Sequence, residues 1–561
     1  MALKIFYLEK TVKMKLNKIF KKILLTGIAL CPFFMASCSS TKNAATKIEN
    51  QEFDYTQEDI RNAEIERIKG LLISRPVEAL WRAVLLGDEE QIKVTSSYVK
   101  DFCASSLEQK DYLELYFAHK SLCNAGFEKL AEEIISKKEL DELFFSKIPG
   151  QNVKKSSSAL TNFSTCISGT VTVWVDLGIK VRMGMGYADR VIGSGFFIDE
   201  RGYFITNHHV IADVVNPKYE GYGKVFIKLA GDEDTRIPAK VVGWDSVHDL
   251  ALLKTEITPP HIFALGSSSD LRPGDRVYAI GSPLGLESTL TSGVVSSTNR
   301  KLFTTGSVLQ IDAAVNSGNS GGPCIDSNGN VQAIVFAGIE KYQGLNFAIP
   351  VEYLKQELAI LYYGGLRRVP WIGAYGHSYK AGTKEIGLEV QYFAPGSALS
   401  RAGVKAGDII TAVEGIPVST MDEIQSVLRT YVPETIIKCE YLTKEREKKS
   451  CILYLTERPK SPGYAFYQGD TIQNSFVPLF GISMIPASTV NNKTYLITDV
   501  IAGSIADESG FSENDPITVG RIQFNDDKTM MFCELSVKRR KKGYLDMTMG
   551  LSTMLDSPYY F

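Results

Sequence analysis

The chain has 561 residues, of which 44% are hydrophobic and 22% charged, a composition typical of globular proteins and unlike collagen, disordered chains or polytopic membrane proteins. The net charge of −2 combines seven lysines and one acidic residue in residues 1–37 with a remainder that is acidic overall. That acidic remainder gives nucleic-acid binding no electrostatic support, and the length predicts several domains.

The first residues have the features of a targeting segment. Lysines continue to Lys22 and are followed by an apolar stretch over residues 23–36, which contains Pro32. This stretch is too short to span a bilayer comfortably. Met14 opens an alternative start with the same features.

The apolar stretch ends in Met35-Ala36-Ser37-Cys38, which resembles a bacterial lipobox with Met35 in place of the usual Leu. The resemblance predicts a signal peptide over residues 1–37, lipidation of Cys38 and a polar tether over residues 38–51. The chain would then be held at a membrane of the bacterial cell envelope, facing the periplasm, by its lipid alone. The alternative is an ordinary signal peptide with an incidental cysteine.

Residues 52–150 are predicted to form a helical domain. Its clearest helix begins at Pro76 and stops at Gly87, residues that favour the first position and the end of a helix respectively. Two interpretations remain open, a bundle that packs against or spaces the next domain and a protein-binding solenoid.

A polar, Ser-rich linker over residues 151–158 is followed by a region with a different residue pattern. Residues 160–362 contain short β-type runs separated by glycines, which predict an antiparallel barrel or sandwich. The runs are 170–175, 225–229, 277–280 and 331–336.

Three segments of this region carry residues suited to nucleophilic catalysis. They contain His209, Asp249 and Ser320, in that order along the chain. A serine hydroxyl needs an imidazole to take its proton, and the imidazole needs a carboxylate to orient it. Glycines around Ser320 let backbone N–H groups turn toward a developing oxyanion.

At these residues the chain resembles the HtrA/Deg family, in which a trypsin-like protease is followed by PDZ domains. The matching motifs occur in the family order and are Gly193-Ser194-Gly195, Thr206-Asn207-His208-His209-Val210, Asp249-Leu250-Ala251-Leu252-Leu253-Lys254, Gly318-Asn319-Ser320-Gly321-Gly322-Pro323 and Asn346-Phe347-Ala348-Ile349-Pro350. The resemblance implies a double β-barrel of the chymotrypsin type.

The resemblance also implies roles for individual residues. His209 is the general base, Asp249 orients it and Ser320 attacks, while the backbone of Gly318, Asn319 and Ser320 forms the oxyanion segment, with Gly318 and Ser320 as donors. His208 and His248 are expected to be structural or solvent-facing neighbours. Ala314 stands at the base of the S1 pocket, so cleavage is expected after small or medium apolar residues. Asp312 is expected to be structural.

Residues 366–458 resemble a PDZ domain through Phe393–Ile410 and a predicted helix over Met421–Leu428. Ile372, Gly373 and Ala374 stand where a PDZ domain holds the carboxylate of a peptide C-terminus. The alternative is that this module only braces its neighbours.

Residues 463–561 are predicted to form a second, divergent PDZ-like domain. Leu479-Phe480-Gly481-Ile482 is similar to a second carboxylate loop, but the usual Gly-Asp-x-Ile is replaced by Asn514-Asp515-Pro516-Ile517. Peptide binding by this unit is therefore an open question. The basic run over residues 538–542 is interpreted as a solvated loop.

Seven cysteines remain after Cys31 and Cys38, and their spacing matches no metal site. Cys439 and Cys451 flank a charged turn and are candidates for a disulfide across a hairpin.

The sequence as a whole predicts a serine endopeptidase that cleaves unfolded or damaged envelope proteins. No cofactor, metal or nucleic acid is expected, and the resemblance implies a homotrimer. The alternative is a chaperone or peptide-binding scaffold that retains the fold with little turnover.

Overall fold

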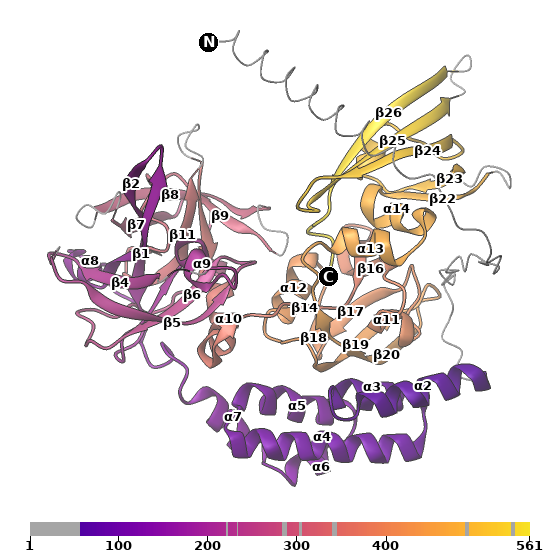
Figure 1. Cartoon of the computed structure of the whole chain (residues 1–561), viewed down its shortest axis with the longest axis horizontal. Helices are drawn as coiled ribbons and strands as arrows, with labels where there is room; N and C mark the ends of the chain where they lie inside the picture. The colour runs from indigo at the N-terminus through magenta and orange to yellow at the C-terminus, as the bar shows by residue number, and fades with distance from the viewer. Residues whose placement is uncertain are drawn as a thin grey trace, which may run out of the picture. The chain divides into compact units, whose positions relative to one another are not determined.

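A computed structural model describes residues 57–561, apart from residues 220, 222, 233, 283–288, 302–305, 339–344, 488–492 and 540–544 (Figure 1). The expected signal peptide, Cys38 and the tether therefore lie outside the described residues. All described residues fall within one unit, Asn50–Phe561. No helix among them is long and apolar enough to cross a membrane.

The region before the barrels is helical, which confirms that part of the predicted fold. Its helices are α2 (Glu58–Leu71), α3 (Pro76–Leu86), α4 (Glu89–Gln109), α5 (Tyr112–Asn124), α6 (Glu128–Glu132) and α7 (Lys137–Phe145). Helix α3 begins and ends as predicted. Gly87 takes a left-handed φ of 67°, and its N–H caps the carbonyl oxygens of Ala83 and Val84.

The helices pack against the PDZ domain that follows the barrels. Trp81 Nε1 donates to the carbonyl oxygen of Ile452 (2.9 Å), and Asn124 Nδ2 donates to that of Ile436 (2.8 Å). Buried side chains of the helices and of that domain share one apolar cluster. These contacts favour the interpretation of the helices as a bundle that packs against another domain of the chain over that of a protein-binding solenoid.

Two six-stranded barrels follow, as the fold prediction required. The first runs β5-β4-β1-β2-β3-β6 and closes through β5–β6, with β13 added on β5; the second is β10-β11-β12-β9-β8-β7. Their elements are α8 (Ser164–Ser168), β1 (Thr170–Arg182), β2 (Met185–Phe197), β3 (Tyr203–Thr206), α9 (His208–Val215), β4 (Lys224–Leu229), β5 (Ile237–Asp245), β6 (Leu250–Thr255), η1 (Ser268–Asp270), β7 (Arg276–Gly281), β8 (Thr289–Arg300), β9 (Val308–Ile311), β10 (Pro323–Ile325), β11 (Val331–Gly338), β12 (Asn346–Pro350), α10 (Val351–Tyr363) and β13 (Gly365–Leu366).

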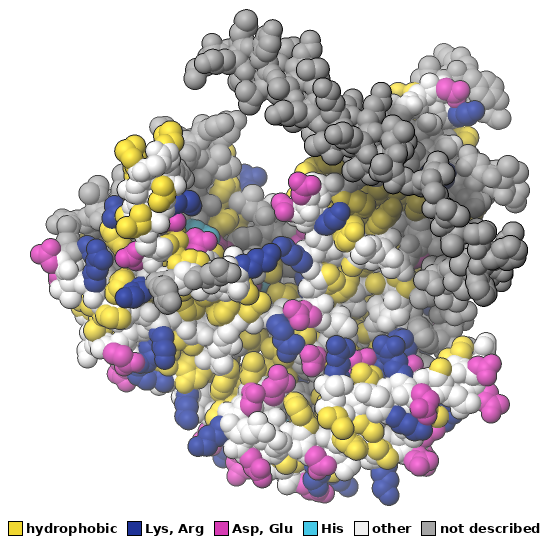
Figure 2. Space-filling view, in the orientation of Figure 1, with side chains coloured by type: hydrophobic (Ala, Val, Ile, Leu, Met, Phe, Trp, Pro, Cys, Tyr) yellow, Lys and Arg dark blue, Asp and Glu magenta, His cyan; other side chains and the backbone are white. Residues whose placement is uncertain are grey.

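Alternation along the strands builds the barrel cores. Val171, Val173 and Val175 of β1 are fully buried because side chains two apart point to the same face of a strand. The far end of the β1–β2 hairpin is different, since its apolar side chains are exposed (Figure 2). The exposed residues are Ile179, Val181, Met183, Met185 and Tyr187.

The chain ends in two PDZ domains. The first contains β14 (Pro370–Trp371), β15 (Ala374–Ala381), β16 (Lys384–Phe393), α11 (Ala398–Arg401), β17 (Ile409–Val413), β18 (Ile416–Pro417), α12 (Met421–Leu428), β19 (Ile436–Leu442), β20 (Lys448–Tyr454) and β21 (Thr456–Glu457). The second contains α13 (Pro462–Gly469), α14 (Ile472–Phe480), β22 (Ile482–Pro486), β23 (Thr494–Val500), α15 (Ile505–Glu508), β24 (Pro516–Phe524), β25 (Met530–Arg539) and β26 (Leu545–Met554). β15 is an edge strand of the first domain's sheet, and β22 is an edge strand of the second's.

Candidate active site

His209 and Asp249 form the first half of the site. Helix α9 starts directly after β3, which puts His209 in its first turn, and Asp249 lies between β5 and β6 with a left-handed φ of 57°. Asp249 Oδ2 lies 2.7 Å from His209 Nδ1, and Asp249 Oδ1 accepts the backbone N–H of His209 at 2.7 Å. An ionised carboxylate only accepts hydrogen bonds, so Nδ1 carries the proton and Nε2 is left as the basic nitrogen.

The Asp249 backbone is itself fixed. Its carbonyl oxygen accepts from Asn207 Nδ2 (2.9 Å) and from the N–H of His208 (3.2 Å). Asp249 is buried and His209 exposed, which leaves the ring open to a substrate while its carboxylate partner is shielded from water.

Ser320 lies in the turn before β10, close to the segment that carries His209 and Val210. A Cβ added to Gly193 would lie 2.6 Å from Val210 Cγ2 and 3.1 Å from the Ser320 carbonyl oxygen, so both segments approach one backbone position. Ser320 is half-buried, and its Oγ donates to the carbonyl oxygen of Phe336 (3.2 Å). Within the described part of the chain, no hydrogen bond joins Ser320 to His209.

The turn after Ser320 requires glycine. Gly321 has a φ of 87°, and an added Cβ would lie 2.2 Å from the Ser194 carbonyl oxygen and 2.4 Å from Thr206 Oγ1. Those contacts leave no space for a side chain. The close approach fixes Ser320 against the β2–β3 pair.

Two amide groups of the oxyanion segment are available. In the described residues, the N–H groups of Gly318 and Ser320 have no partner, whereas the N–H of Asn319 donates to the Asn316 carbonyl oxygen (3.0 Å). Asn319, grouped with the other two on sequence, is therefore used inside the turn. The arrangement leaves Gly318 and Ser320 as possible anion donors.

Ser194 also holds the active-site turn in place, a role that the sequence did not predict. Its buried Oγ donates to the Gly318 carbonyl oxygen (2.6 Å) and accepts the N–H of Ser282 (2.9 Å), while its own N–H donates to the Ser320 carbonyl oxygen (2.7 Å). Ser194 thus holds the turn on both sides of Asn319. The only signal in the sequence was its place between Gly193 and Gly195.

The residues expected to shape the S1 pocket lie just before this turn. Ala314 is exposed, and its carbonyl oxygen accepts from Thr291 Oγ1 (2.9 Å). Asp312 Oδ1 accepts the N–H of Val294 (2.5 Å), a contact that ties two neighbouring strands. The Asp312 carboxylate is thus engaged with backbone.

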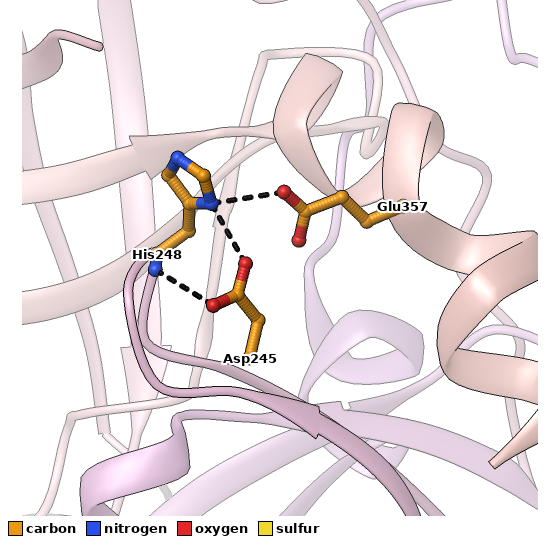
Figure 3. A group of neighbouring side chains, drawn as sticks. All are labelled: Asp245, His248 and Glu357. Atoms are coloured by element: carbon orange, nitrogen blue, oxygen red, sulfur yellow. Dashed lines mark hydrogen bonds and ion pairs between the residues drawn. The ribbon is translucent and has the colours of Figure 1, made fainter. Parts of the chain in front are cut away.

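A buried group of charges lies directly behind Asp249. His248 Nδ1 is 2.7 Å from Asp245 Oδ2 and 2.9 Å from Glu357 Oε1, and Figure 3 shows both carboxylates directed at this nitrogen. Arg367 Nε lies 3.6 Å from Glu357 Oε1. Burial lowers the pKa of His248, but the two carboxylates outweigh it and raise the pKa to about 9.

The same group has the composition of a metal site, since its ligand atoms lie within 4.8 Å of one another. Two protein cations, His248 and Arg367, already balance the carboxylates of Asp245 and Glu357. Burial, the largest influence on the pKa of Glu357, raises it. We therefore interpret the group as a structural charge network.

His208, by contrast, is half-buried, and burial lowers its pKa.

The comparisons with known proteins identify a protease domain and PDZ domains in this chain. The trypsin-like peptidase domain model matches residues 193–334, the PDZ domain model 389–437, the TP0546 family PDZ domain model 463–555 and a domain of unknown function 59–144. A putative serine protease HhoA of Synechocystis is 32% identical over 277 residues, which cover 45% of this chain and 68% of the relative. The chain belongs to the HtrA/DegP family of serine proteases.

Other members of the HtrA/DegP family match a longer stretch. A probable periplasmic serine endoprotease DegP-like of Bartonella henselae is 33% identical over 342 residues, which cover 58% of this chain and 65% of the relative. The chain thus spans slightly less than two thirds of that relative's length. Among solved structures, the HtrA-type protease AlgW with tripeptide is 26% identical and covers 53% of this chain and 98% of its own, with a TM-score of 0.44.

The predicted carboxylate loop of this HtrA-family chain is engaged by another part of the same chain. Ile372 is buried, and the N–H groups of Gly373 and Ala374 both donate to the carbonyl oxygen of Phe561, at 3.0 and 2.9 Å. Phe561 is the last residue of the printed sequence.

Two further expectations concern the remaining parts of the chain. Cys439 and Cys451 lie directly opposite one another in the β19–β20 hairpin, and both are free thiols. Part of the basic run, residues 540–542, lies outside the described residues, as do residues 339–344 of the loop between β11 and β12.

Proposed function

We propose that this chain is a serine endopeptidase whose nucleophile is Ser320. The observation that carries the proposal is the pairing of His209 with the buried Asp249 beside a turn that offers two unpartnered amides. This combination supplies the base, its orienting carboxylate and the anion donors that peptide-bond cleavage requires.

The chemistry follows from these positions. Nε2 of His209 takes the hydroxyl proton as Ser320 Oγ forms a bond to the substrate carbonyl carbon, and the carbonyl oxygen becomes an oxyanion facing the N–H groups of Gly318 and Ser320. When the peptide bond breaks, the departing amine takes the proton from Nε2. Water then repeats the sequence on the acyl-enzyme and releases Ser320.

In the structure the hydroxyl of Ser320 donates to the Phe336 carbonyl oxygen. The hydroxyl proton must therefore turn away from Phe336 before attack, because one hydroxyl proton cannot serve both acceptors. We propose that the described arrangement is a resting state, and that substrate binding favours the rotamer that faces His209.

The proposed substrates are unfolded or damaged proteins, cleaved after small or medium apolar residues. Ala314 offers only a methyl group at the expected base of the S1 pocket, and Oδ1 of Asp312 accepts the backbone N–H of Val294. Apolar residues are buried in native proteins and become available when proteins unfold. Sequencing the cleaved ends by mass spectrometry tests this, and cuts mainly after Lys or Arg contradict it.

We also propose location in the cell envelope, lipid attachment at Cys38 and assembly into a trimer. The relatives named periplasmic endoproteases support the location. The exposed apolar end of the β1–β2 hairpin supports association with other copies. Acyl-chain detection on Cys38 and the mass of the assembly in solution test the last two; an unmodified Cys38 or a monomer overturns them.

Cleavage of unfolded β-casein tests the central proposal. The mature chain should degrade casein, Ser320→Ala should not, and Ser157→Ala, an exposed serine in the linker, should match the parent. Equal casein loss with the parent and Ser320→Ala removes Ser320 from the mechanism. Casein that stays intact with the parent, while aggregation is suppressed, favours the chaperone or scaffold alternative.

A further inference from the structure

The end of the printed sequence lies along the edge of the first PDZ domain's sheet and forms a single β-bridge with it. Tyr560 forms an antiparallel bridge with Tyr375 of the edge strand β15. The N–H of Gly376 donates to the Tyr559 carbonyl oxygen (3.2 Å), and the N–H of Phe561 donates to the Ala374 carbonyl oxygen (3.0 Å). These bonds follow the backbone pattern of strand addition, the mode by which PDZ domains hold peptides, over the last three residues.

Phe561 occupies the position where such a peptide ends. Its oxygen receives both amides of the carboxylate loop, and its side chain is 2% exposed. The ring belongs to the same buried cluster as Ile372, Ile424 and Leu428. A large apolar ring therefore fills the pocket between the loop and α12.

The two residues before Phe561 make different contacts, because Tyr559 lies in a turn closed by the N–H of Tyr560 on the Ser557 carbonyl oxygen (3.2 Å). Tyr559 lies against His377, with ring centroids 4.1 Å apart. Tyr560 packs edge-on against Phe466 of the second PDZ domain, at 5.1 Å, and its hydroxyl donates to the Pro478 carbonyl oxygen (3.0 Å). Tyr559 thus contacts the first domain, while Tyr560 ties the segment to the second.

Two polar contacts fix the segment upstream of these rings. Arg458 makes a two-pronged ion pair with Asp556, with Nη1 3.0 Å from Oδ2. Gln425 Nε2, on α12, donates to the Pro558 carbonyl oxygen (3.1 Å). The segment is therefore held from β15 on one side and from α12 on the other.

We infer that residues 556–561 are a built-in ligand of the first PDZ domain, and that an external peptide end competes with this segment for the groove. Such a peptide binds only after it displaces the segment. This inference rests on the proposed peptide-binding role of the first PDZ domain and is independent of catalysis by Ser320.

Competition within one chain is strong because the segment is always nearby, at an effective concentration on the order of millimolar for short connections. When the segment occupies the groove in almost all molecules, the apparent affinity for an external peptide is its intrinsic affinity multiplied by the fraction of molecules with an open groove. Removing the ring of Phe561 should raise that fraction.

The test measures binding of a fluorescein-labelled peptide Asp-Ser-Pro-Tyr-Tyr-Phe, with a free carboxylate, to the full chain. All proteins carry Ser320→Ala, so that no peptide is cleaved. Phe561→Ala should bind the probe at least about tenfold more tightly than the unsubstituted chain. Phe532→Ala, which removes an exposed Phe of β25, should bind it as weakly as the unsubstituted chain. A probe that ends in Ala should bind none of them.

Equal probe affinity of the unsubstituted chain and Phe561→Ala overturns the inference, as does equal binding of the probe that ends in Ala. If Phe561→Ala unfolds, Tyr559→Ala replaces it, because Tyr559 is 44% exposed, and it too must bind the probe more tightly than the unsubstituted chain. Absence of probe binding in every variant refutes the peptide-binding role, whereas the casein assay alone decides on Ser320.

Discussion

In both PDZ domains a glycine with a left-handed φ precedes the edge strand, Gly373 before β15 and Gly481 before β22. The carbonyl oxygen of each glycine accepts an N–H from the loop after the next strand. Ala394 donates to Gly373 (2.8 Å) and Ile501 donates to Gly481 (2.9 Å). A short helix follows in each domain, and its N-cap is Ser397 in the first and Ser504 in the second.

The two glycine loops differ in where their amide groups point. Gly373 follows the short strand β14, and its N–H donates outward to Phe561. Gly481 follows helix α14, and its N–H donates back to the Val477 carbonyl oxygen (2.9 Å) as the helix C-cap. The element that precedes the glycine therefore decides whether the loop can hold a carboxylate, and in the second domain the amide of Gly481 is used internally.

The largest expected effect concerns the buried charges behind Asp249. Arg367 Nη2 links this group to the first PDZ domain by donating to the Arg429 carbonyl oxygen (2.7 Å), and no described hydrogen bond links it to the second. Breaking a buried ion pair costs about 3–5 kcal/mol. His248→Gln should lower the free energy of unfolding by that amount and speed amide exchange in α12 but not in α14. Equal exchange changes in both helices would contradict the asymmetry.

This effect has a defined pH dependence. The folded pKa of His248 is raised from 6.5 to about 9, so the stabilisation is complete below pH 6.5 and is lost as the pH rises through 9. Urea denaturation of the parent between pH 6.5 and 9 should show this loss, and His248→Gln should not. His208→Gln is the matched control, because burial lowers the pKa of His208 and the substitution should keep the parent's slope.

The second effect compares the two glycines directly. A Cβ on Gly481 would lie 2.2 Å from Ser504 Cβ, whereas one on Gly373 would lie 3.2 Å from Ser397 Cβ. Both substitutions place a Cβ in the left-handed conformation, which lowers the free energy of unfolding by about 1–2 kcal/mol. Gly481→Ala lowers it by about 1–3 kcal/mol more, because the added Cβ overpacks the loop.

Thermal unfolding should therefore show a larger loss for Gly481→Ala than for Gly373→Ala. Adding Ser504→Gly to Gly481→Ala removes the clashing atom and should recover part of the difference. A larger loss at Gly373, or no recovery in the double variant, would refute this reading of the second loop.

The sequence predicted the barrels and the two PDZ domains, because short motifs with fixed spacing mark them, and the same motifs named the residues of the candidate active site. It did not predict that Phe561 contacts Gly373, since nothing local in either segment points to a partner almost 190 residues away. The role of Ser194 was missed for the same reason. The state of the Gly481 amide depends on α14, a helix that contains Pro478 and therefore lacks the usual helix pattern.

The sequence also placed the divergence of the second domain at Asn514, where the first domain has Gly407. The structure shows the same backbone at both positions, with left-handed φ values of 64° for Asn514 and 94° for Gly407. The N–H of Asn514 donates to Ile497 (2.8 Å), and that of Gly407 donates to Val390 (2.7 Å). Asn tolerates this conformation better than other residues with a side chain, so the departure preserves the turn.

The smallest expected effect follows from that equivalence. Asn514→Gly should change the free energy of unfolding by no more than about 0.5 kcal/mol, as for a surface substitution without a special role. Asn514→Val should cost about 1–2 kcal/mol, because a branched side chain does not fit the left-handed conformation. Thermal unfolding of the three proteins checks both values. If Asn514→Gly were strongly destabilising, the asparagine side chain would have a role of its own, and the two turns would no longer be equivalent.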